Sequence, residues 1–324
     1  MSGKAIDAVV VARRALTGRI AEFCIGRADG RPLPIAESGS HIELHFGGGG
    51  RHFVRHYSIV GPLTLRDEFE PFWRIAVQRE DRARGSAFLH ANVRPGTTLT
   101  ISRPINAFRL SRQRANTLLV AGGIGITPIV AMARSLRSRN VDFTMFYAGQ
   151  ERAAMAYVDD ALEGLCGDRL TVHESARDGI PDLVELLSRQ PAGTVVYVCG
   201  PAAMIEAVRE ASAILGWSRE RVRFEVFNAA HRPDDGDFDV RLPNGSHVKV
   251  GAGTTILDAL ELAGVATLSS CRRGECGLCI TDVAACDGEL DHRDRYFSDE
   301  EHRVGRQIAI CCSRITGRAL ALNI

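Results

Sequence analysis

The chain has 324 residues, of which 45% are hydrophobic and 24% are charged, and its formal net charge at pH 7 is +1. This length fits two or three domains, and the near-neutral charge gives no reason to expect a nucleic-acid partner. No apolar run approaches the roughly 20 residues that cross a bilayer, and Met1–Leu16 lack a signal-peptide core. We therefore expect a cytoplasmic protein without a membrane partner, whose nine cysteines include metal ligands rather than disulfides.

Residues 1–112 are predicted to be rich in β-strands. Ile42–Phe46 alternates apolar and polar residues, and Trp73–Val77 and Thr98–Ile101 are further short strand candidates. Glycines and prolines interrupt the segments between them. Closely spaced strands with turn signals indicate a small antiparallel β-barrel domain.

The pattern changes in residues 113–228, where apolar strands alternate with helical segments. The strand candidates are Thr117–Val120, Phe143–Tyr147, Leu170–Val172 and Val195–Val198. The helical candidates lie between them, and include Pro181–Arg189 and Ala202–Leu215. Alternation of this kind predicts an α/β domain with a parallel sheet.

Residues 229–237 are predicted to be a linker, and residues 238–324 to form a third, α+β domain. Asp239–Leu242 and His247–Val250 flank an Asn-Gly pair, which is a hairpin signal. Thr255 is placed to cap a helix that Gly264 would end. The hairpin and helix directly precede a cluster of cysteines.

That cluster has the spacing C-x4-C-x2-C, formed by Cys271, Cys276 and Cys279, with a fourth cysteine at Cys311 or Cys312. This is the pattern of plant-type [2Fe–2S] ligation. Glycines within the loop would let backbone N–H groups point at the sulfurs. Structural zinc is the weaker alternative, because it usually takes two close cysteine pairs and only one is present. Cys286 lies outside the spacing and is expected to be an ordinary buried thiol.

A glycine-rich loop follows the strand at Thr117–Val120 and opens a helix. Its candidate binding residues are Gly122, Gly123, Gly125, Thr127 and Pro128. Such a loop lets backbone approach a phosphate at a helix N-terminus, although a tight strand-to-helix turn also needs glycine. Cys199-Gly200-Pro201 ends another strand of the same sheet. Since ligands bind at the carboxyl ends of parallel strands, we expect the two turns to form one nucleotide site.

Arg55-His56-Tyr57-Ser58 lies at the end of a predicted barrel strand. An arginine can hold a flavin phosphate with two hydrogen bonds, a tyrosine can pack on the flavin ring, and a serine can bond its polar edge. A surface arginine beside a core tyrosine is the alternative interpretation of this segment taken alone.

With these segments in order, the chain resembles the phthalate dioxygenase reductase family, and it is similar to vanillate O-demethylase reductase subunits. The resemblance spans nearly the whole chain. Its landmarks are Arg55–Ser58, Gly85-Ser86, Gly122–Pro128, Tyr197–Pro201, Phe224–Phe227, the cysteine loop, Asp291–Asp294 and Cys311–Arg314.

The resemblance implies FMN, NADH and a [2Fe–2S] cluster as cofactors. FMN would be held by Arg55, His56, Tyr57, Ser58, Arg84, Gly85 and Ser86, and NADH by the glycine loop and Cys199, Gly200 and Pro201. The residues implied nearest to the reacting atoms are Ser58, Cys199 and Phe227. The family's final Ser-Arg, here Ser313-Arg314, implies that Cys311 is the fourth cluster ligand and Cys312 the variable residue.

The sequence departs from the family pattern at two places. Arg84 stands where the family commonly has glycine, and an arginine there could still serve a phosphate. The arginine–serine pair that often follows the second strand of the nucleotide domain is missing after Tyr147, and Arg152 is the nearest cation. We expect NADH rather than NADPH, with Arg152 as the residue that could reverse this preference.

The function implied by the resemblance is electron transfer from NADH through FMN and the [2Fe–2S] cluster to a Rieske-type oxygenase, for example in aromatic degradation. Flavin is needed between the other two because NADH delivers two electrons as hydride and the cluster accepts one electron at a time. A reductase for another one-electron acceptor and a redox sensor without sustained turnover are the alternatives. We expect a monomer.

Overall fold

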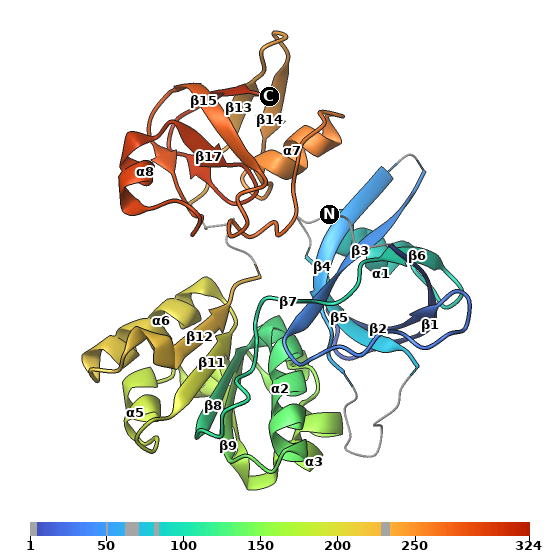
Figure 1. Cartoon of the computed structure of the whole chain (residues 1–324), viewed down its shortest axis with the longest axis vertical. Coiled ribbons are helices and arrows are strands. Elements are labelled where there is room, and N and C mark those ends of the chain that lie inside the picture. Colours follow the sequence, from blue (N-terminus) through green and yellow to red (C-terminus); the bar gives the residue numbers. More distant parts are fainter. Residues whose placement is uncertain (1–4, 50, 62–70, 81–83, 228–233) are drawn as a thin grey trace. The chain divides into compact units, whose positions relative to one another are not determined.

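The computed structural model describes residues 5–49, 51–61, 71–80, 84–227 and 234–324. These fall into two compact units, Met1–Glu225 and Val226–Ile324, whose elements are labelled in Figure 1. Residues 229–233 of the predicted linker lie outside the described residues. So do Gly50 and Pro62, two of the residues that interrupt the predicted strands of the first domain. Within the described residues, no helix combines the length and the apolar character that crossing a membrane requires.

The first half of unit one is a near-closed antiparallel barrel (Figure 1). The strands follow one another around it in the order β4-β3-β6-β1-β2-β5, with β7 paired to β3. Their bounds are β1 Ile6–Ala15, β2 Ile20–Arg27, β3 Ser40–Gly48, β4 Arg51–Ser58, β5 Trp73–Gln78, β6 Thr98–Ile101 and β7 Ile105–Asn106. The N–H of Val60 donates to the carbonyl of Arg74 at 2.9 Å, which ties the chain after β4 to β5 and brings the two ends of the sheet together.

Alternation of side chains explains how this barrel fills its interior. In β1, Ile6, Ala8 and Val10 are buried and the residues between them face outward. The helix α1 (Arg84–Asn92) contributes Leu89 to the same core. The barrel predicted from the sequence is therefore confirmed, although the sequence does not identify the first two strands individually.

The second half of unit one is a parallel sheet with the order β10-β9-β8-β11-β12. The strand bounds are β8 Thr117–Gly122, β9 Phe143–Gly149, β10 Leu170–Glu174, β11 Val195–Cys199 and β12 Val222–Glu225. The helices are α2 Ile126–Ser138, α3 Glu163–Cys166, α4 Ser175–Asp178, α5 Leu183–Ser188 and α6 Ala202–Ile214. Every residue of β8 is buried, as expected for the central strand of a sheet with both faces covered. The strand order reverses between β8 and β11, and ligands bind beside such a switch point.

Buried contacts join the barrel to this sheet inside unit one. The hydroxyl of Tyr157 donates to the buried carboxylate of Glu22 on β2 at 2.9 Å. The hydroxyl of Tyr197 on β11 accepts from the N–H of Ser111 at 2.8 Å. The 3₁₀ turn Gly123–Gly125 lies beside barrel strand β5. The glycine loop of the sheet therefore faces the barrel.

The second unit has the α+β fold expected for a ferredoxin. Its sheet has the order β14-β13-β19-β15-β17, and β16 pairs with β18 separately. The bounds are β13 Phe238–Arg241, β14 His247–Val250, α7 Ile256–Leu262, β15 Ile280–Cys286, β16 Leu290–Asp291, α8 Asp299–Val304, β17 Gln307–Ala309, β18 Arg314–Ile315 and β19 Ala319–Asn323. Thr255 caps α7 as predicted, accepting from the N–H of Asp258 at 2.9 Å.

Candidate electron-transfer site

The cysteine loop of the second unit gathers sulfur atoms and aims backbone N–H groups at them. Cys279 and Cys311 are buried, Cys271 is half-buried and Cys276 is exposed. The N–H groups of Arg273 and Glu275 donate to Sγ of Cys271 at 3.4 and 3.3 Å, and the N–H of Gly274 donates to Sγ of Cys311 at 3.2 Å. Hydrogen bonds from Cys311 and from this backbone lower the pKa of the Cys271 thiol. The pKa of the Cys279 thiol is also lowered, first by its bond to Cys311, whereas partial burial of its thiol raises the pKa of Cys276. At Cys271 and Cys279 the surroundings thus favour the thiolate, which is the form that binds iron.

The two adjacent cysteines Cys311 and Cys312 point to different surroundings. Sγ of Cys311 interacts with the thiols of Cys271, Cys279 and Cys312. Sγ of Cys312 also lies 3.7 Å from the carbonyl of Ala309 and 3.7 Å from the hydroxyl of Ser313. Cys311 therefore meets two of the three loop cysteines directly, with Cys312 beside it.

The predicted flavin segment forms the end of β4. Arg55 and Tyr57 share one face of this strand, and Tyr57 packs against the barrel core. Burial raises the pKa of the Tyr57 hydroxyl. A Cβ atom on Gly85 would lie 3.1 Å from Nε of Arg55, so this guanidinium lies directly against the first turn of α1. An arginine next to a helix N-terminus is suited to bind a phosphate.

Two other residues of the predicted flavin set, His56 and Ser58, do not share the face of β4 that carries Arg55 and Tyr57: one lies on the opposite face and the other at the end of the strand. His56 lies on the opposite face of β4, where its ring stacks on His41 at 5.2 Å between centroids and lies 3.4 Å from the carboxylate of Glu43. Its side chain thus has a partner away from the Arg55 face. Ser58 is buried at the last position of β4, where the strand alternation ends.

Gly85 and Ser86 are expected from the resemblance to form a turn, and they lie instead in the first turn of α1. The hydroxyl of Ser86 accepts from the N–H of Glu80 at 3.0 Å. The side chain of Arg84 lies outside the described residues. A helix start supplies the same N–H groups as a phosphate-binding turn, so the predicted role is compatible with the observed element.

The two predicted nucleotide turns pack against each other at the carboxyl edge of the sheet. A Cβ atom on Gly125 would lie 2.2 Å from the carbonyl oxygen of Cys199, and one on Gly122 would lie 2.7 Å from Cδ of Pro201. Gly123 has a φ of 51°, which glycine adopts readily. The close packing therefore explains why these positions are glycine.

The remaining residues of these turns lie at the starts of helices. Thr127 and Pro128 are buried in the first turn of α2, where the Thr127 hydroxyl donates to the carbonyl of Ile124 at 3.1 Å. Pro201 is the N-cap residue of α6. Two helix N-termini thus meet beside β8 and β11, and together they form a place suited to an anionic group.

Two family models match segments of this chain. Residues 99–222 match the family model "Dimethylamine monooxygenase subunit DmmA-like, N-terminal domain", and residues 241–316 match "2Fe-2S iron-sulfur cluster binding domain". The chain is 35% identical to the vanillate O-demethylase oxidoreductase of Pseudomonas sp. over 98% of this chain and 100% of the relative. It is also 35% identical to the carnitine monooxygenase reductase subunit of Escherichia coli, over 95% of each chain.

The solved structure of phthalate dioxygenase reductase covers 99% of this chain and 98% of its own, with a TM-score of 0.77 and 29% identity. The chain belongs to the phthalate dioxygenase reductase family. It is an oxidoreductase with a [2Fe–2S] binding domain. The solved phthalate dioxygenase reductase is described as a modular structure for electron transfer from pyridine nucleotides to [2Fe–2S].

Glu225 belongs to the Phe224–Phe227 landmark, but the landmark alone predicts no role for this residue. Glu225 is 4% exposed at the end of β12, directly paired with Cys199 on β11. A buried carboxylate beside the nucleotide turn is a candidate for holding a proton or a polar edge of a ligand. An acidic residue at the carboxyl end of a parallel strand is the signal that could have found it. Phe227, which is expected near the flavin, is half-buried in the second unit, and its role stays a prediction.

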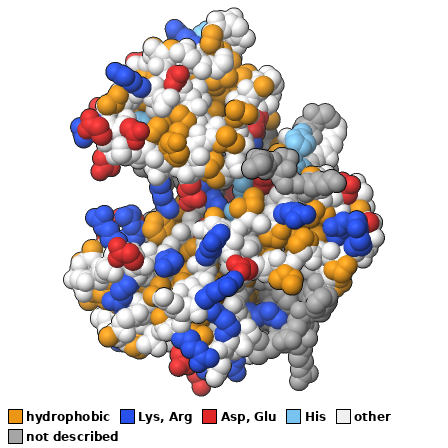
Figure 2. Space-filling model, viewed as in Figure 1, with side chains coloured by type: hydrophobic (Ala, Val, Ile, Leu, Met, Phe, Trp, Pro, Cys, Tyr) orange, Lys and Arg blue, Asp and Glu red, His pale blue; other side chains and the backbone are white. Residues whose placement is uncertain are grey.

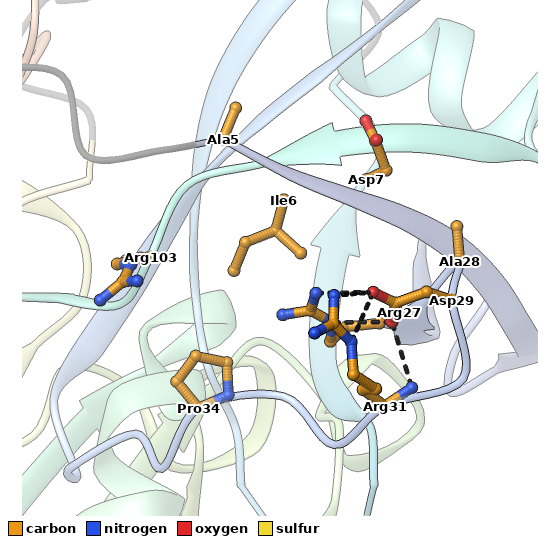
Figure 3. Close-up of a pocket in the computed structure, with 9 residues that line it drawn as sticks. All are labelled: Ala5, Ile6, Asp7, Arg27, Ala28, Asp29, Arg31, Pro34 and Arg103. Carbon is orange, nitrogen blue, oxygen red and sulfur yellow. Dashed lines mark hydrogen bonds and ion pairs between the residues drawn. The ribbon is translucent and has the colours of Figure 1, made fainter.

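A cavity of about 700 Å³ on the barrel lies apart from the predicted flavin and nucleotide residues. Figure 3 shows its lining residues, which come from β1, the end of β2 and the segments that follow β2 and β6. Arg27 and Arg31 both bind Asp29, at 2.7 and 2.5 Å, so this one carboxylate offsets part of their charge within the cavity wall. None of the predicted cofactor residues lines it.

Replacing Gly125 with Ala is expected to destabilise unit one by about 1–3 kcal/mol, the usual cost of overpacking a filled site. The added methyl group would collide with the backbone of Cys199. Urea unfolding followed by tryptophan fluorescence measures this, because Trp73 and Trp217 both belong to unit one. Gly164→Ala is the matched control, since a methyl group added there would meet no neighbouring atom within 4 Å. Equal stability of the two variants would contradict the prediction.

Proposed function

We propose that this reductase transfers electrons from NADH, through FMN and a [2Fe–2S] cluster, to the Rieske-type oxygenase of a two-component system. The observation that supports this most is the group of four cysteine sulfurs with three backbone N–H donors, carried by the same chain as the paired nucleotide turns. The relatives support the partner, because several are named as reductase subunits or oxidoreductases of oxygenase and demethylase systems.

The residues around Arg55 fit the single phosphate of FMN. Arg55 lies against Gly85 at the start of α1, so one guanidinium and one helix N-terminus would share the phosphate. Bound flavin supplies the conversion between a two-electron hydride donor and a one-electron acceptor. The chain itself positions the ring, with the half-buried Tyr57 packed between the core and its side of the pocket.

The nucleotide turns hold the other substrate against the barrel. Gly123, where an added Cβ atom would meet no neighbouring atom within 4 Å, allows close approach of the pyrophosphate, and the N-termini of α2 and α6 face its charge. Cys199 at the end of β11, beside Glu225, would line the nicotinamide end of this site. The loop Gly123–Gly125 faces β5, so a nicotinamide held there points toward the barrel.

NADH is favoured over NADPH by the charges that follow β9 and β10. Arg152, the cation that could bind a 2′-phosphate, is bound by Asp159 and Glu163 at 2.5 Å each. The backbone N–H of Arg152 donates to the carboxylate of Glu174, the last residue of β10, at 2.8 Å. These acidic residues suit a ribose hydroxyl and oppose a phosphate.

The purified reductase is expected to contain one FMN and two irons per chain, with matching acid-labile sulfide. The flavin follows from the Arg55–Gly85 contact, and the iron from the four thiols. Released flavin is identified by chromatography, and iron and sulfide are assayed chemically. FAD in place of FMN, or zinc without sulfide, would contradict the prediction.

Catalytic turnover tests the function as a whole. We expect sustained NADH-dependent reduction of cytochrome c, together with support of substrate oxidation when the cognate oxygenase is added. Reduction of cytochrome c without any productive oxygenase would favour another one-electron acceptor as the partner. A single turnover without sustained reduction would favour a redox sensor. We further propose that the reductase is a monomer of the cytoplasm.

A further inference from the structure

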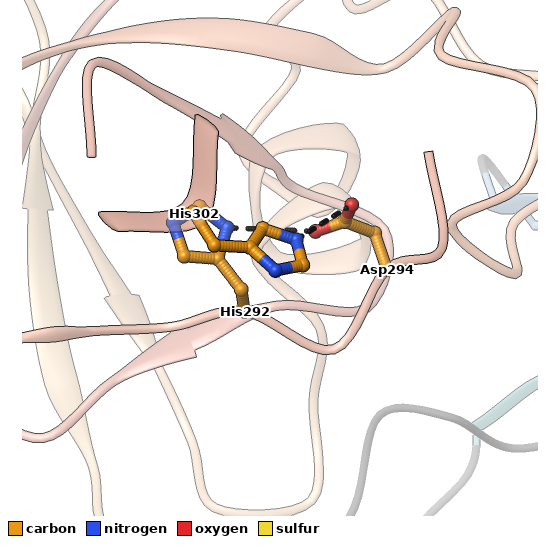
Figure 4. A group of neighbouring side chains, drawn as sticks. All are labelled: His292, Asp294 and His302. Carbon is orange, nitrogen blue, oxygen red and sulfur yellow. Dashed lines mark hydrogen bonds and ion pairs between the residues drawn. The ribbon is translucent and has the colours of Figure 1, made fainter. Parts of the chain in front are cut away.

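Two histidines and an aspartate of the second unit come together outside the cysteine loop. His292 and Asp294 follow β16, and His302 belongs to α8; Figure 4 shows the three side chains directed toward one another. One nitrogen or oxygen atom from each lies within 4.8 Å of the others. We propose that His292, Asp294 and His302 bind one divalent transition-metal ion, with zinc as the best match, at a site separate from the iron–sulfur cluster.

His292 is the residue whose surroundings most need an explanation. Its side chain is 6% exposed, and within the described part of the chain neither ring nitrogen has a hydrogen-bond partner. Its Nδ1 lies 3.5 Å from Oδ1 of Asp294. Burial, and then the neighbouring His302, lower the pKa of His292, while Asp294 acts in the opposite direction. A neutral imidazole has one unprotonated ring nitrogen, whose lone pair can bind a metal ion.

Asp294 is held in place as an ionised ligand. Its side chain is fully buried, and it accepts the N–H groups of Tyr296 and Phe297 at 3.2 and 3.0 Å and the hydroxyl of Ser313 at 3.3 Å. Burial alone would raise its pKa, but the bonds from Phe297 and His302 bring the pKa below its usual value. Ligating carboxylates in metal sites are oriented by such outer hydrogen bonds.

The donor types match zinc, and their separations are close to those between zinc ligands. Nε2 of His302 lies 3.2 Å from Oδ2 of Asp294, at hydrogen-bonding distance, and Nδ1 of His292 lies 3.5 Å from the other carboxylate oxygen, Oδ1. Ligand atoms of tetrahedral zinc are about 3.3 Å apart at the usual bond lengths. Imidazole and carboxylate together suit zinc, whereas calcium and magnesium prefer oxygen ligands alone.

The ring of His302 must turn for all three ligands to face one ion. It stacks on His292 with 4.4 Å between ring centroids and 25° between planes, so the lone pairs of the two rings are nearly parallel. His302 is 26% exposed on a six-residue helix, and it is therefore the ring with access to solvent. This exposed edge gives the ion a way in and leaves a position for water. The first turn of α8 carries three acidic residues, Asp299 to Glu301, of which Glu300 pairs with Arg303, and Figure 2 shows acidic side chains on the surface of the second unit.

The proposed site is also joined to the cluster loop. A Cβ atom on Gly274 would lie 2.8 Å from Cα of Asp294, and the N–H of Arg295 donates to the carbonyl of Gly274 at 2.9 Å. Gly274 is the residue whose own N–H donates to Sγ of Cys311. An ion that fixes Asp294 would therefore support the backbone that surrounds the iron ligand.

The test adds Zn²⁺ to the full-length, cluster-loaded protein and measures bound zinc and its affinity by competition with a chromophoric chelator. We expect one zinc per chain without loss of cluster absorbance, and an affinity at least about tenfold weaker in His302→Gln, as for the removal of a metal-site contact. His247→Gln is the matched control, because His247 is an exposed histidine on β14 of the same unit. Absence of tight zinc binding, or equal affinities in the wild type and His302→Gln, overturns the proposal and leaves an imidazole–carboxylate hydrogen-bond cluster only.

X-ray absorption at the zinc edge tests the ligands without any variant. We expect nitrogen and oxygen ligands with the multiple-scattering pattern of imidazole. Sulfur ligands would place zinc at the cysteines, and a shell of water alone would show adventitious binding; either result overturns the proposal. The measurement does not depend on how well His302→Gln folds.

Discussion

Cys311→Ser is expected to abolish the visible cluster absorbance and to lower NADH-dependent cytochrome c reduction by about 100-fold or more, because the cluster needs four thiolates. Flavin reduction by NADH should continue, since all the residues assigned to FMN and NADH except Phe227 belong to the first unit. The N–H of Gly274 donates to Sγ of Cys311, and this sulfur interacts with Cys271 and Cys279. Absorbance spectra and stopped-flow reduction of the flavin measure the two effects separately.

Cys312→Ser is the matched control, with the same substitution one residue away. Its sulfur packs against the carbonyl of Ala309 and the position of Gly274, so a hydroxyl there should leave the cluster in place. The opposite pattern, with the cluster lost in Cys312→Ser and kept in Cys311→Ser, would move the fourth ligand to Cys312. Equal loss in both variants would show that the segment is needed for folding and would leave the assignment unsupported.

Features that depend on neighbouring residues could be predicted from the sequence. The cysteine spacing, the Asn244-Gly245 hairpin and the Thr255 helix cap are set by local geometry, and each lies where it was expected. The parallel strands were also found, because runs such as β8 are buried on both faces and therefore uniformly apolar.

Features that depend on distant pairing could not be predicted in the same way. β1 carries Arg13 and Arg14 in its second half, and its pairing with β2 shifts register between Val10 and Ala12. The alternation of apolar and polar residues that identifies a strand is therefore interrupted. Helix α1 is weakly amphipathic and contains Gly85 and Ser86, which are typical of turns. Cys286 was expected to be buried, but on β15 it is only half-buried.

The polar clusters were missed for a related reason. Glu225 and Cys199 are 26 positions apart and meet only because β11 and β12 are parallel neighbours. His302 reaches Asp294 through a capping box that starts α8 at Ser298. The landmarks Phe224–Phe227 and Asp291–Asp294 contain Glu225 and Asp294, but they do not name the partner of either residue, since each contact is made by the tertiary fold.

The reductase is expected to use NADH about 100-fold more efficiently than NADPH, as judged by kcat/KM. A 2′-phosphate adds up to two negative charges. A carboxylate about 4 Å away near the protein surface would repel each of them by about 1–4 kcal/mol. The phosphate would approach Arg152, whose pKa is raised by its bonds to Asp159 and Glu163 and whose charge they already balance. Steady-state kinetics with both nucleotides measures the preference.

Replacing both carboxylates, in Asp159→Asn with Glu163→Gln, is expected to raise kcat/KM for NADPH by about tenfold, which corresponds to about 1.4 kcal/mol. The guanidinium of Arg152 would then be available to the phosphate, while NADH, which lacks this group, should be used nearly as before. Adding Arg152→Ala to the double variant should remove the gain. Glu206→Gln is the control, because Glu206 pairs with Arg209 on α6, and it should change kcat/KM for neither nucleotide. Equal kcat/KM for NADH and NADPH in the wild type would contradict the preference itself. An unchanged NADPH efficiency in the double variant would instead show that the preference is set by Glu174 at the end of β10, whose carboxylate accepts the N–H of Arg152 and pairs with Arg177 at 3.1 Å.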